Sequence, residues 1–320
     1  MKLLTLDTGG KGHPGVLLDE DTVLDLALAA DRVAQARLVP GSVRGIFAAG
    51  ADGLEAVRRA AGAVGSMAGA ERDRLRETGA LRGFADAPLL APIPDPRLIL
   101  SEGLNYRRHL EEMSGTPTPP NPTAFIKAAC SLTGSGKPIW VPPQCPDMID
   151  YEGEFTFAIG RRCHRVSADE AMACIGGYTI CNDVSARDWV GEVFNAEAKF
   201  GIIQAWERNI MGKQLPGFTP CGPVVVTADE IADPHDLQLT TTLNGEIVQS
   251  TGTDDLIFGV AEILSYFSRW YRFEPGDLVT TGSPAGVGFG RDPKLFMKPG
   301  DRIEVEIGGI GRLSNTLASG

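Results

Sequence analysis

The stretch IDYEGEFTFAIG, residues 149–160, has the alternating pattern of a β-strand with one apolar face and one acidic face. Successive side chains of a strand point to opposite sides, so Phe155 and Phe157 share the apolar face. Glu152 and Glu154 lie on the other face with Cα atoms about 7 Å apart, where two carboxylates can converge on one cation. A solvated strand face is the competing interpretation. Repulsion between the two acids and the apolar flanking residues argue against it.

A third acid follows in GGYTICNDVSARDW, residues 176–189. An apolar strand is expected to end at Asp183, and residues 185–188 are expected to begin a helix. A carboxylate at the end of a buried strand is costly unless it is paired or bound to a metal. Three carboxylates from two strands suit a hard cation, Mg²⁺ with Mn²⁺ or Ca²⁺ as alternatives. The competing interpretation makes Asp183 a helix cap or a partner of Arg187.

The segment EGLNYRRHLEEM, residues 102–113, contains a histidine and a carboxylate at helical spacing. His109 and Glu112 stand three residues apart, so they share one face of a helical turn. A carboxylate that orients an imidazole is the arrangement of a general base that activates water. The competing interpretation is that His109 and Glu112 form an exposed pair on the face of a surface helix. The following SGTPTPPNP, residues 114–122, is expected to be a loop that can act as a lid.

Positive charge near these acids is expected from four basic side chains, Arg107, Arg108, Lys127 and Lys213. Surface solubility is the competing explanation for each. The segment TTGSPAGVGFG, residues 280–290, is rich in glycine but lacks the lysine and flanking elements of a phosphate-binding loop. We interpret it as a pocket of backbone donors for a carboxylate, with the Ser283 hydroxyl as an additional donor.

Composition narrows the class of protein. The formal net charge is −11, which disfavours nucleic acid and anionic membranes as partners. The sequence has no apolar run long enough for a membrane span and no recognisable signal peptide. The six cysteines form no C-x-x-C pair, so we expect buried free thiols and a cytoplasmic protein.

The chain divides into two parts that differ in composition and in expected secondary structure. Residues 1–90 are expected to form a small N-terminal α/β domain with a helical stretch over 52–79, followed by a proline-rich linker. Residues 97–320 are expected to form the catalytic domain, with a hairpin turn at Asn244-Gly245 and a helix over 258–271. The fold class is α+β, mainly β.

With these motifs in order, the sequence resembles the fumarylacetoacetate hydrolase family. The resemblance runs from about Leu98 to Leu317 and is highly specific as an ordered series. The motifs are GLNYRRH, FIKA, DYEGEFTFAIGR, GYTICNDVSARD, GKQLPGFTPCGP, TGSPAGVG and KPGDRIEVEIGGIGRL. It implies a catalytic domain of rolled mixed β-sheets, a homodimer and a magnesium-type cofactor.

The resemblance also assigns roles to residues. It places the metal on Glu152, Glu154 and Asp183. It places catalysis on His109, Glu112 and Lys213. The substrate contacts are expected to be Tyr106, Arg107, Lys127, Arg187 and Ser283. Departures from the family pattern lie at Gln214-Leu215-Pro216, at Ser283, at Arg108 and over residues 193–209.

The reaction favoured by these assignments is hydrolysis of a carbon–carbon bond in a 4-acyl-2-oxo acid, with aromatic catabolism as the expected setting. His109 would activate the water, while the metal and Lys213 stabilise the departing enolate. Decarboxylation of oxaloacetate-like acids and tautomerisation or isomerisation of unsaturated dioates are sister reactions. A non-catalytic metal-binding protein is the alternative of another class. A nucleotide-binding oxidoreductase is rejected because no Rossmann fingerprint is present.

Overall fold

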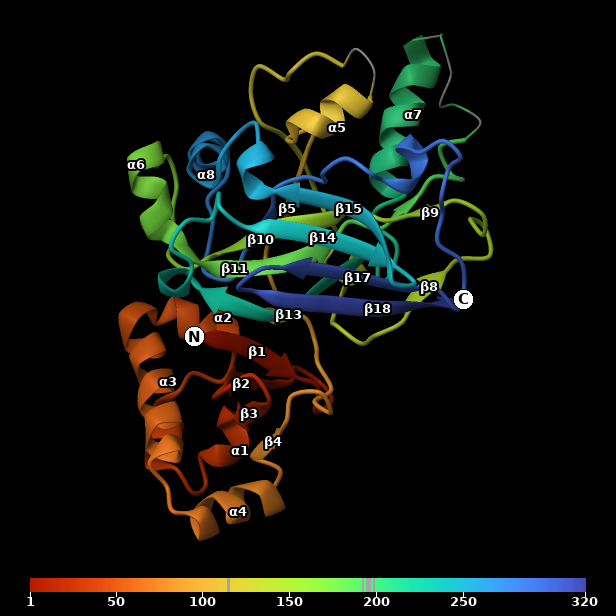
Figure 1. Ribbon diagram of the computed structural model, residues 1–320. Helices are drawn as coiled ribbons and strands as arrows, with labels where there is room; N and C mark the ends of the chain where they lie inside the picture. Colours follow the sequence, from red (N-terminus) through yellow and green to blue (C-terminus); the bar gives the residue numbers. More distant parts are fainter. Residues whose placement is uncertain (114–115, 192, 194–196, 198) are drawn as a thin grey trace.

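A large mixed β-sheet, built from strands of both parts of the chain, dominates the computed structural model, which describes residues 1–113, 116–191, 193, 197 and 199–320 (Figure 1). Its strand order is β4-β3-β2-β1-β13-β11-β10-β16-β5-β6, with β7 beside β13. The strands are β1 (Lys2–Leu6), β2 (His13–Leu17), β3 (Thr22–Asp25), β4 (Leu81–Gly83), β5 (Ile99–Gly103), β6 (Thr123–Ile126), β7 (Leu132–Thr133), β10 (Gly153–Ile159), β11 (Ile175–Asn182), β13 (Thr219–Thr227) and β16 (Leu278–Thr280).

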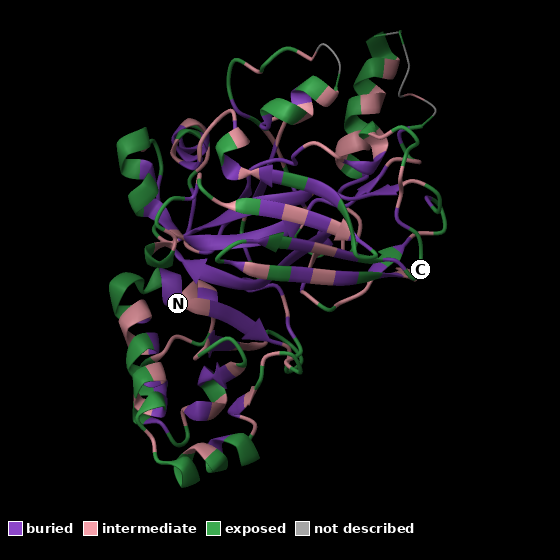
Figure 2. Ribbon diagram, in the orientation of Figure 1, coloured by how far each residue is buried: buried purple, intermediate pink, exposed green. Residues whose placement is uncertain are grey.

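A second sheet covers one face of the first, in the order β15-β14-β17-β18-β8, and β9 pairs with β12 nearby. These strands are β8 (Ile139–Val141), β9 (Ile149–Asp150), β12 (Ser185–Ala186), β14 (Gln238–Leu243), β15 (Glu246–Gly252), β17 (Arg302–Ile307) and β18 (Gly311–Ser319). Burial alternates along β17 and β18, as expected for a sheet with one face toward the core and one toward solvent (Figure 2).

The helices lie at the periphery of the sheets (Figure 1). The α-helices are α1 (Leu26–Ala29), α2 (Val43–Ala48), α3 (Gly50–Gly65), α4 (Gly69–Glu77), α5 (Arg107–Glu112), α6 (Ala168–Ala171), α7 (Lys199–Met211) and α8 (Val260–Ser268). Short 3₁₀ helices span Ala34–Leu38, Ala129–Ser131, Met172–Cys174, Ala228–Glu230, Thr253–Asp255 and Gly288–Gly290. The structure is therefore mainly β with a minority of helix, which confirms the predicted fold class.

Strand β10 is buried along its whole length because apolar groups cover both of its faces. Phe155 and Phe157 pack in a core cluster that also contains Val305 of the second sheet and Ile263 of α8. Ala158 belongs instead to the cluster that contains the N-terminal helices. The strand that carries Glu154 thus lies between two hydrophobic core clusters.

Several local predictions are confirmed and others need correction. The hairpin turn forms, with positive φ values of 53° at Asn244 and 87° at Gly245. Helix α8 occupies most of the expected 258–271 segment, whereas the helical stretch over 52–79 is two helices, α3 and α4. The expected helix start at residues 185–188 is wrong, because Ser185 and Ala186 pair with β9 as strand β12.

The cysteines also depart in part from the prediction. All six are free, and five are buried, but Cys130 is exposed.

Across the described part of the chain, the structure contains no helix with the length and apolarity required to cross a membrane.

Candidate functional site

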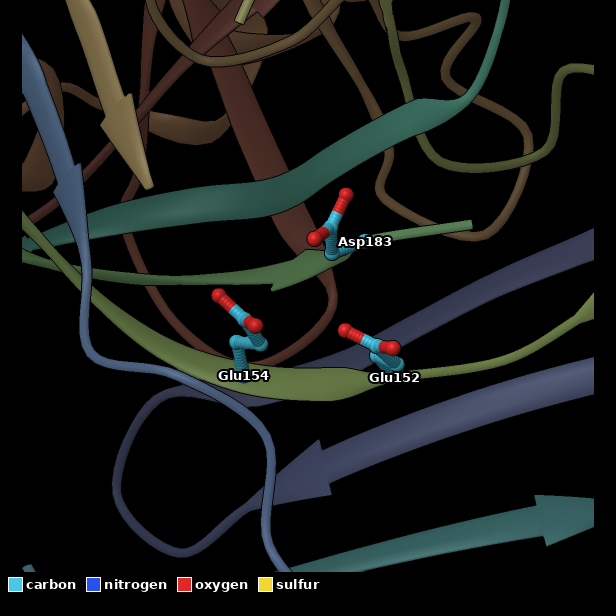
Figure 3. A group of neighbouring side chains, drawn as sticks. All are labelled: Glu152, Glu154 and Asp183. Atoms are coloured by element: carbon cyan, nitrogen blue, oxygen red, sulfur yellow. The ribbon is translucent and has the colours of Figure 1, made fainter. Parts of the chain in front are cut away.

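The pairing of β10 with β11 brings the three predicted metal-binding carboxylates together. The strands are antiparallel, with Gly153 opposite Asn182, so Asp183 follows the end of β11 beside the start of β10. The Asp183 N–H donates to the Glu152 carbonyl at 2.8 Å, and the Glu152 N–H donates to the Asn182 side chain at 2.9 Å. Carboxylate oxygens of Glu152, Glu154 and Asp183 consequently lie within 4.8 Å of one another (Figure 3).

These carboxylates fit a divalent cation. Glu154 and Asp183 are almost fully buried, and among the described residues no group hydrogen-bonds Glu154 Oε2. Burial, followed by the charges of Asp183 and Glu152, raises the pKa of Glu154 well above its usual value. A buried carboxylate oxygen without a partner is costly, and a hard cation is the partner that three converging oxygen donors prefer. The donor set and the unpaired oxygen therefore favour the predicted metal site.

Two buried lysines lie against the same carboxylates. Lys213 Nζ is 2.7 Å from Glu152 Oε2 and 2.6 Å from Asp183 Oδ2. Lys127 Nζ pairs with the other oxygen of Asp183 and donates to the Lys213 carbonyl at 2.8 Å. Burial opposes the charged form of Lys213, but Asp183 and Glu152 outweigh it and raise its pKa. Burial also opposes ionisation of Glu152, yet Lys213 and Arg187 lower its pKa to about 2. The site is thus a network of acidic and basic side chains in direct contact.

Arg187 is a further basic side chain of this network. Its guanidinium pairs with Glu152 and with Asp150, the latter at 3.1 Å. Asp150 is fully buried and also accepts the backbone N–H groups of Gly288 at 2.7 Å and Phe289 at 3.2 Å. Asp150 therefore ties the glycine-rich segment to the start of the acidic strand. The sequence analysis assigned it no role, although it stands in the same acidic motif as Glu152.

The expected pair of His109 and Glu112 forms on α5. His109 Nδ1 is 3.1 Å from Glu112 Oε2, which leaves Nε2 free for other contacts. The Gly286 N–H donates to the Glu112 carboxylate at 3.1 Å. Burial opposes ionisation of Glu112, but these two partners outweigh it and lower its pKa. The glycine-rich segment that donates the Gly286 N–H to Glu112 also donates the Gly288 N–H to Asp150, so this segment connects the pair to the start of the acidic strand. The predicted lid begins with residues 114–115, which lie outside the described residues.

Ser283 is connected to the acidic strand through a residue that the sequence analysis missed. Gln249 on β15 donates from Nε2 to Ser283 Oγ at 3.0 Å, and its Oε1 accepts the Gly153 N–H at 3.0 Å. Gln249 is 2% exposed. Since Gly153 stands between Glu152 and Glu154, Gln249 positions the backbone of the metal-binding segment. The signal available for this residue was a glutamine at a position of the hairpin strand where the side chain is buried.

Tyr106 and Arg107, two expected substrate contacts, differ in their hydrogen bonding. Tyr106 is fully buried, and its hydroxyl has no hydrogen-bond partner among the described residues. Arg107 donates to the backbone oxygens of Leu256 at 2.6 Å and Asp254 at 3.2 Å. Their predicted contacts with the substrate therefore remain predictions.

Comparison with known proteins identifies the family of this chain. The sequence model described as fumarylacetoacetate (FAA) hydrolase C-terminal matches residues 98–318, which include all of the candidate site residues. The chain belongs to the fumarylacetoacetate hydrolase family.

Several relatives within this family are named as oxaloacetate tautomerases. Oxaloacetate tautomerase YisK of Bacillus subtilis (strain 168) is 32% identical over 319 residues, which cover 99% of this chain and 100% of the relative. The mitochondrial oxaloacetate tautomerase FAHD2B of Homo sapiens is 35% identical and covers 73% of this chain and 70% of its own length. A solved fumarylacetoacetate hydrolase from psychrophilic Exiguobacterium antarcticum superposes with a TM-score of 0.76 at 30% identity, over 100% of both chains.

Proposed function

We propose that this protein interconverts the keto and enol forms of oxaloacetate or a similar small 2-oxo dioate. The observation that carries the proposal is the carboxylate cluster, with two buried lysines against it and the His109–Glu112 pair bonded to the same glycine-rich segment as Asp150. The similarity to a full-length oxaloacetate tautomerase supports this choice among the reactions of the family. Tautomerisation was an alternative in the sequence analysis and now replaces hydrolysis as the preferred reaction.

The site residues can supply the binding and the proton transfer that this reaction needs. A divalent cation on Glu152, Glu154 and Asp183, which we propose to be Mg²⁺ or Mn²⁺, would supply positive charge that favours the enolate form of a 2-oxo acid. Lys213 and Lys127 add positive charge for the anionic substrate in an otherwise acidic protein.

The enol-to-keto direction requires loss of the hydroxyl proton at the C2 oxygen and addition of a proton at C3. When Nδ1 of His109 is held by Glu112, Nε2 is the nitrogen available to deliver the C3 proton. The proton released from the hydroxyl group returns to the imidazole through solvent, so the reaction needs no other reactant. Lys213 stabilises the negative charge that passes over the C2 oxygen.

Hydrolysis of an acylpyruvate is the second candidate, because a histidine oriented by a carboxylate can equally activate water. The two reactions differ in what they consume. Tautomerisation leaves the carbon skeleton intact, whereas hydrolysis releases pyruvate and an acid.

A parallel assay distinguishes the candidates. The loss of enol-oxaloacetate absorbance and the release of pyruvate from acylpyruvates are followed with Mg²⁺ or Mn²⁺ present. We expect metal-dependent tautomerisation well above the solvent rate. His109→Ala is expected to lower it by roughly 10²- to 10⁴-fold, the usual contribution of general acid–base catalysis. His164→Ala is the matched control, since His164 is exposed and, among the described residues, its ring bonds to the Tyr271 carbonyl. Acylpyruvate cleavage without tautomerase activity would reject the proposal in favour of hydrolysis.

A further inference from the structure

A second cavity lies between the N-terminal helices and the large sheet, and the proposed reaction does not use it. Its volume is about 600 Å³, and its lining includes Arg44 and Phe47 of α2, Arg97, Arg161 and Glu274. The segments that meet there are α2, the residue stretch before β5, the end of β10 and the stretch before β16. Such a volume falls in the range of pockets that hold small organic ligands.

The cavity concentrates positive charge in an acidic protein. Four arginines line it, and Glu274 is the one acid among its lining residues. Glu274 is already paired with Arg162 at 2.8 Å, and Arg44 is paired with Asp95 at 2.6 Å.

The acids that act on the other two arginines do so at longer range, Glu274 on Arg97 and Glu170 on Arg161. In the part of the chain that the structure describes, neither Arg97 nor Arg161 forms an ion pair. The Arg161 guanidinium donates to the thiol of Cys174 at 3.6 Å, which is a neutral partner. Both arginines are exposed, so a ligand can reach them from solvent. In a chain with a net charge of −11, surface solubility does not explain two such groups facing one cavity.

The cavity is separate from the carboxylate site. Strands β10, β16 and β5 are neighbours in the large sheet, and the two sites lie at opposite ends of these strands. Glu154 is the second residue of β10 and Arg161 follows its end, a span of about 23 Å at the usual rise of a strand. Arg97 precedes β5, while His109 follows that strand on α5.

We propose that this cavity is a binding site for a small organic anion that carries at least two negative charges, as phosphate or carboxylate groups. Guanidinium groups bind both kinds of group through paired N–H donors, and two of them accommodate two charges. The volume exceeds what a single inorganic ion fills, which favours an organic ligand.

The test is calorimetric titration of the full-length chain with pyrophosphate, ATP and citrate, with Mg²⁺ in excess over each anion. Binding of ATP but not citrate would identify an organic phosphate ligand, binding of citrate alone would identify a polycarboxylate, and binding of pyrophosphate alone would count against an organic ligand. We expect Arg161→Ala and Arg97→Ala each to weaken binding by roughly tenfold or more, and the affinity to fall as ionic strength rises. Arg32→Ala removes the same charge from an exposed position outside the cavity and should leave binding unchanged.

A second variant tests the cavity without removal of an arginine. Ala48 is exposed on the cavity lining, so Ala48→Glu adds a negative charge there with little effect on the core. This variant should also lose binding while its melting temperature stays close to that of the wild type. The proposal is overturned if none of the three anions binds, or if Arg32→Ala weakens binding as much as Arg161→Ala does.

Discussion

Lys213 stands between two carboxylates that a metal ion would also use. Its ammonium group is within 2.7 Å of both Glu152 and Asp183, and the side chain is almost fully buried. The Lys213→Met variant leaves these carboxylates without that partner. We expect it to lower the free energy of unfolding by roughly 3–5 kcal/mol in the absence of metal, the usual cost of one lost member of a buried ion pair. Urea unfolding with and without Mn²⁺ measures this change.

Mn²⁺ is expected to reduce that loss, because a bound cation replaces the missing charge and stabilises the folded state. Removal of the competing ammonium group should also raise Mn²⁺ affinity, whereas turnover should fall mainly through kcat. Lys137→Met is the matched control, since it breaks a partly exposed lysine pair with Asp7 and should cost less than about 1 kcal/mol. Equal losses in both variants would show that Lys213 has no special place in the site.

Sequence reasoning succeeded for residues that are close together in the chain. The His109–Glu112 pair follows from helical spacing, and the Glu152–Glu154 pair follows from strand alternation. Gln249 escaped notice because its contact with Gly153 joins positions 96 residues apart. No local pattern encodes such a contact, and it becomes visible only when the two sheets are packed together.

The start of strand β10 depends on the absence of a side chain at Gly153. A Cβ atom there would lie 2.3 Å from Thr241 Oγ1 and 3.0 Å from a methyl group of Val305. Both neighbours are buried residues on strands β14 and β17 of the second sheet, so they have little room to move. Gly153 thus allows the second sheet to approach the segment that carries Glu152 and Glu154.

Gly153→Ala is accordingly expected to lower the free energy of unfolding by roughly 1–3 kcal/mol, the usual cost of an overpacked core. It should also weaken Mn²⁺ binding, because the strand must shift between its two acidic residues. Gly103→Ala is a suitable control, since this strand glycine has open space around its Cβ position and no positive φ. Urea unfolding and Mn²⁺ titration of both variants decide the matter. A destabilised Gly153→Ala with unchanged Mn²⁺ affinity would separate packing from the site.

At the scale of strands, local sequence predicted turns better than it predicted which strands pair. The Asn244-Gly245 hairpin formed because its turn residues tolerate positive φ. In contrast, residues 185–188 were expected to begin a helix, whereas Ser185 and Ala186 pair with β9. The local preference of Ser185 for a helix start had less effect than pairing with a strand more than 30 residues earlier in the chain.

The N-terminal part and the catalytic part of the chain share one sheet and one core. Strand β1 pairs with β13, with Leu3 opposite Val225. The core cluster on that side combines N-terminal residues such as Val57 with Ala158 and Leu278 of the catalytic part. A boundary near residues 90–97 was predicted from the prolines, and the sequence contains no sign that β1 would cross it.

From this shared core we expect the whole molecule to unfold in one cooperative transition. All four tryptophans lie beyond residue 97, so their fluorescence reports on the catalytic part alone. Far-UV ellipticity also senses the N-terminal helices, among them α3, which has 16 residues. Urea unfolding with saturating Mg²⁺ should therefore give the same midpoint with both probes, because loss of β1 would expose the apolar side of β13.

Deletion of residues 1–90 extends the same prediction. The truncated chain would present β13 as an unpaired edge with buried residues such as Val225 exposed, which favours aggregation. We expect the fragment 91–320 to be insoluble or to lose most of its stability when expressed alone, as judged by gel filtration and thermal unfolding. Two separate midpoints in the full chain, or a soluble fragment with unchanged tautomerase activity and melting temperature, would contradict this view. The N-terminal part would then be an appendage rather than a structural half of the catalytic core.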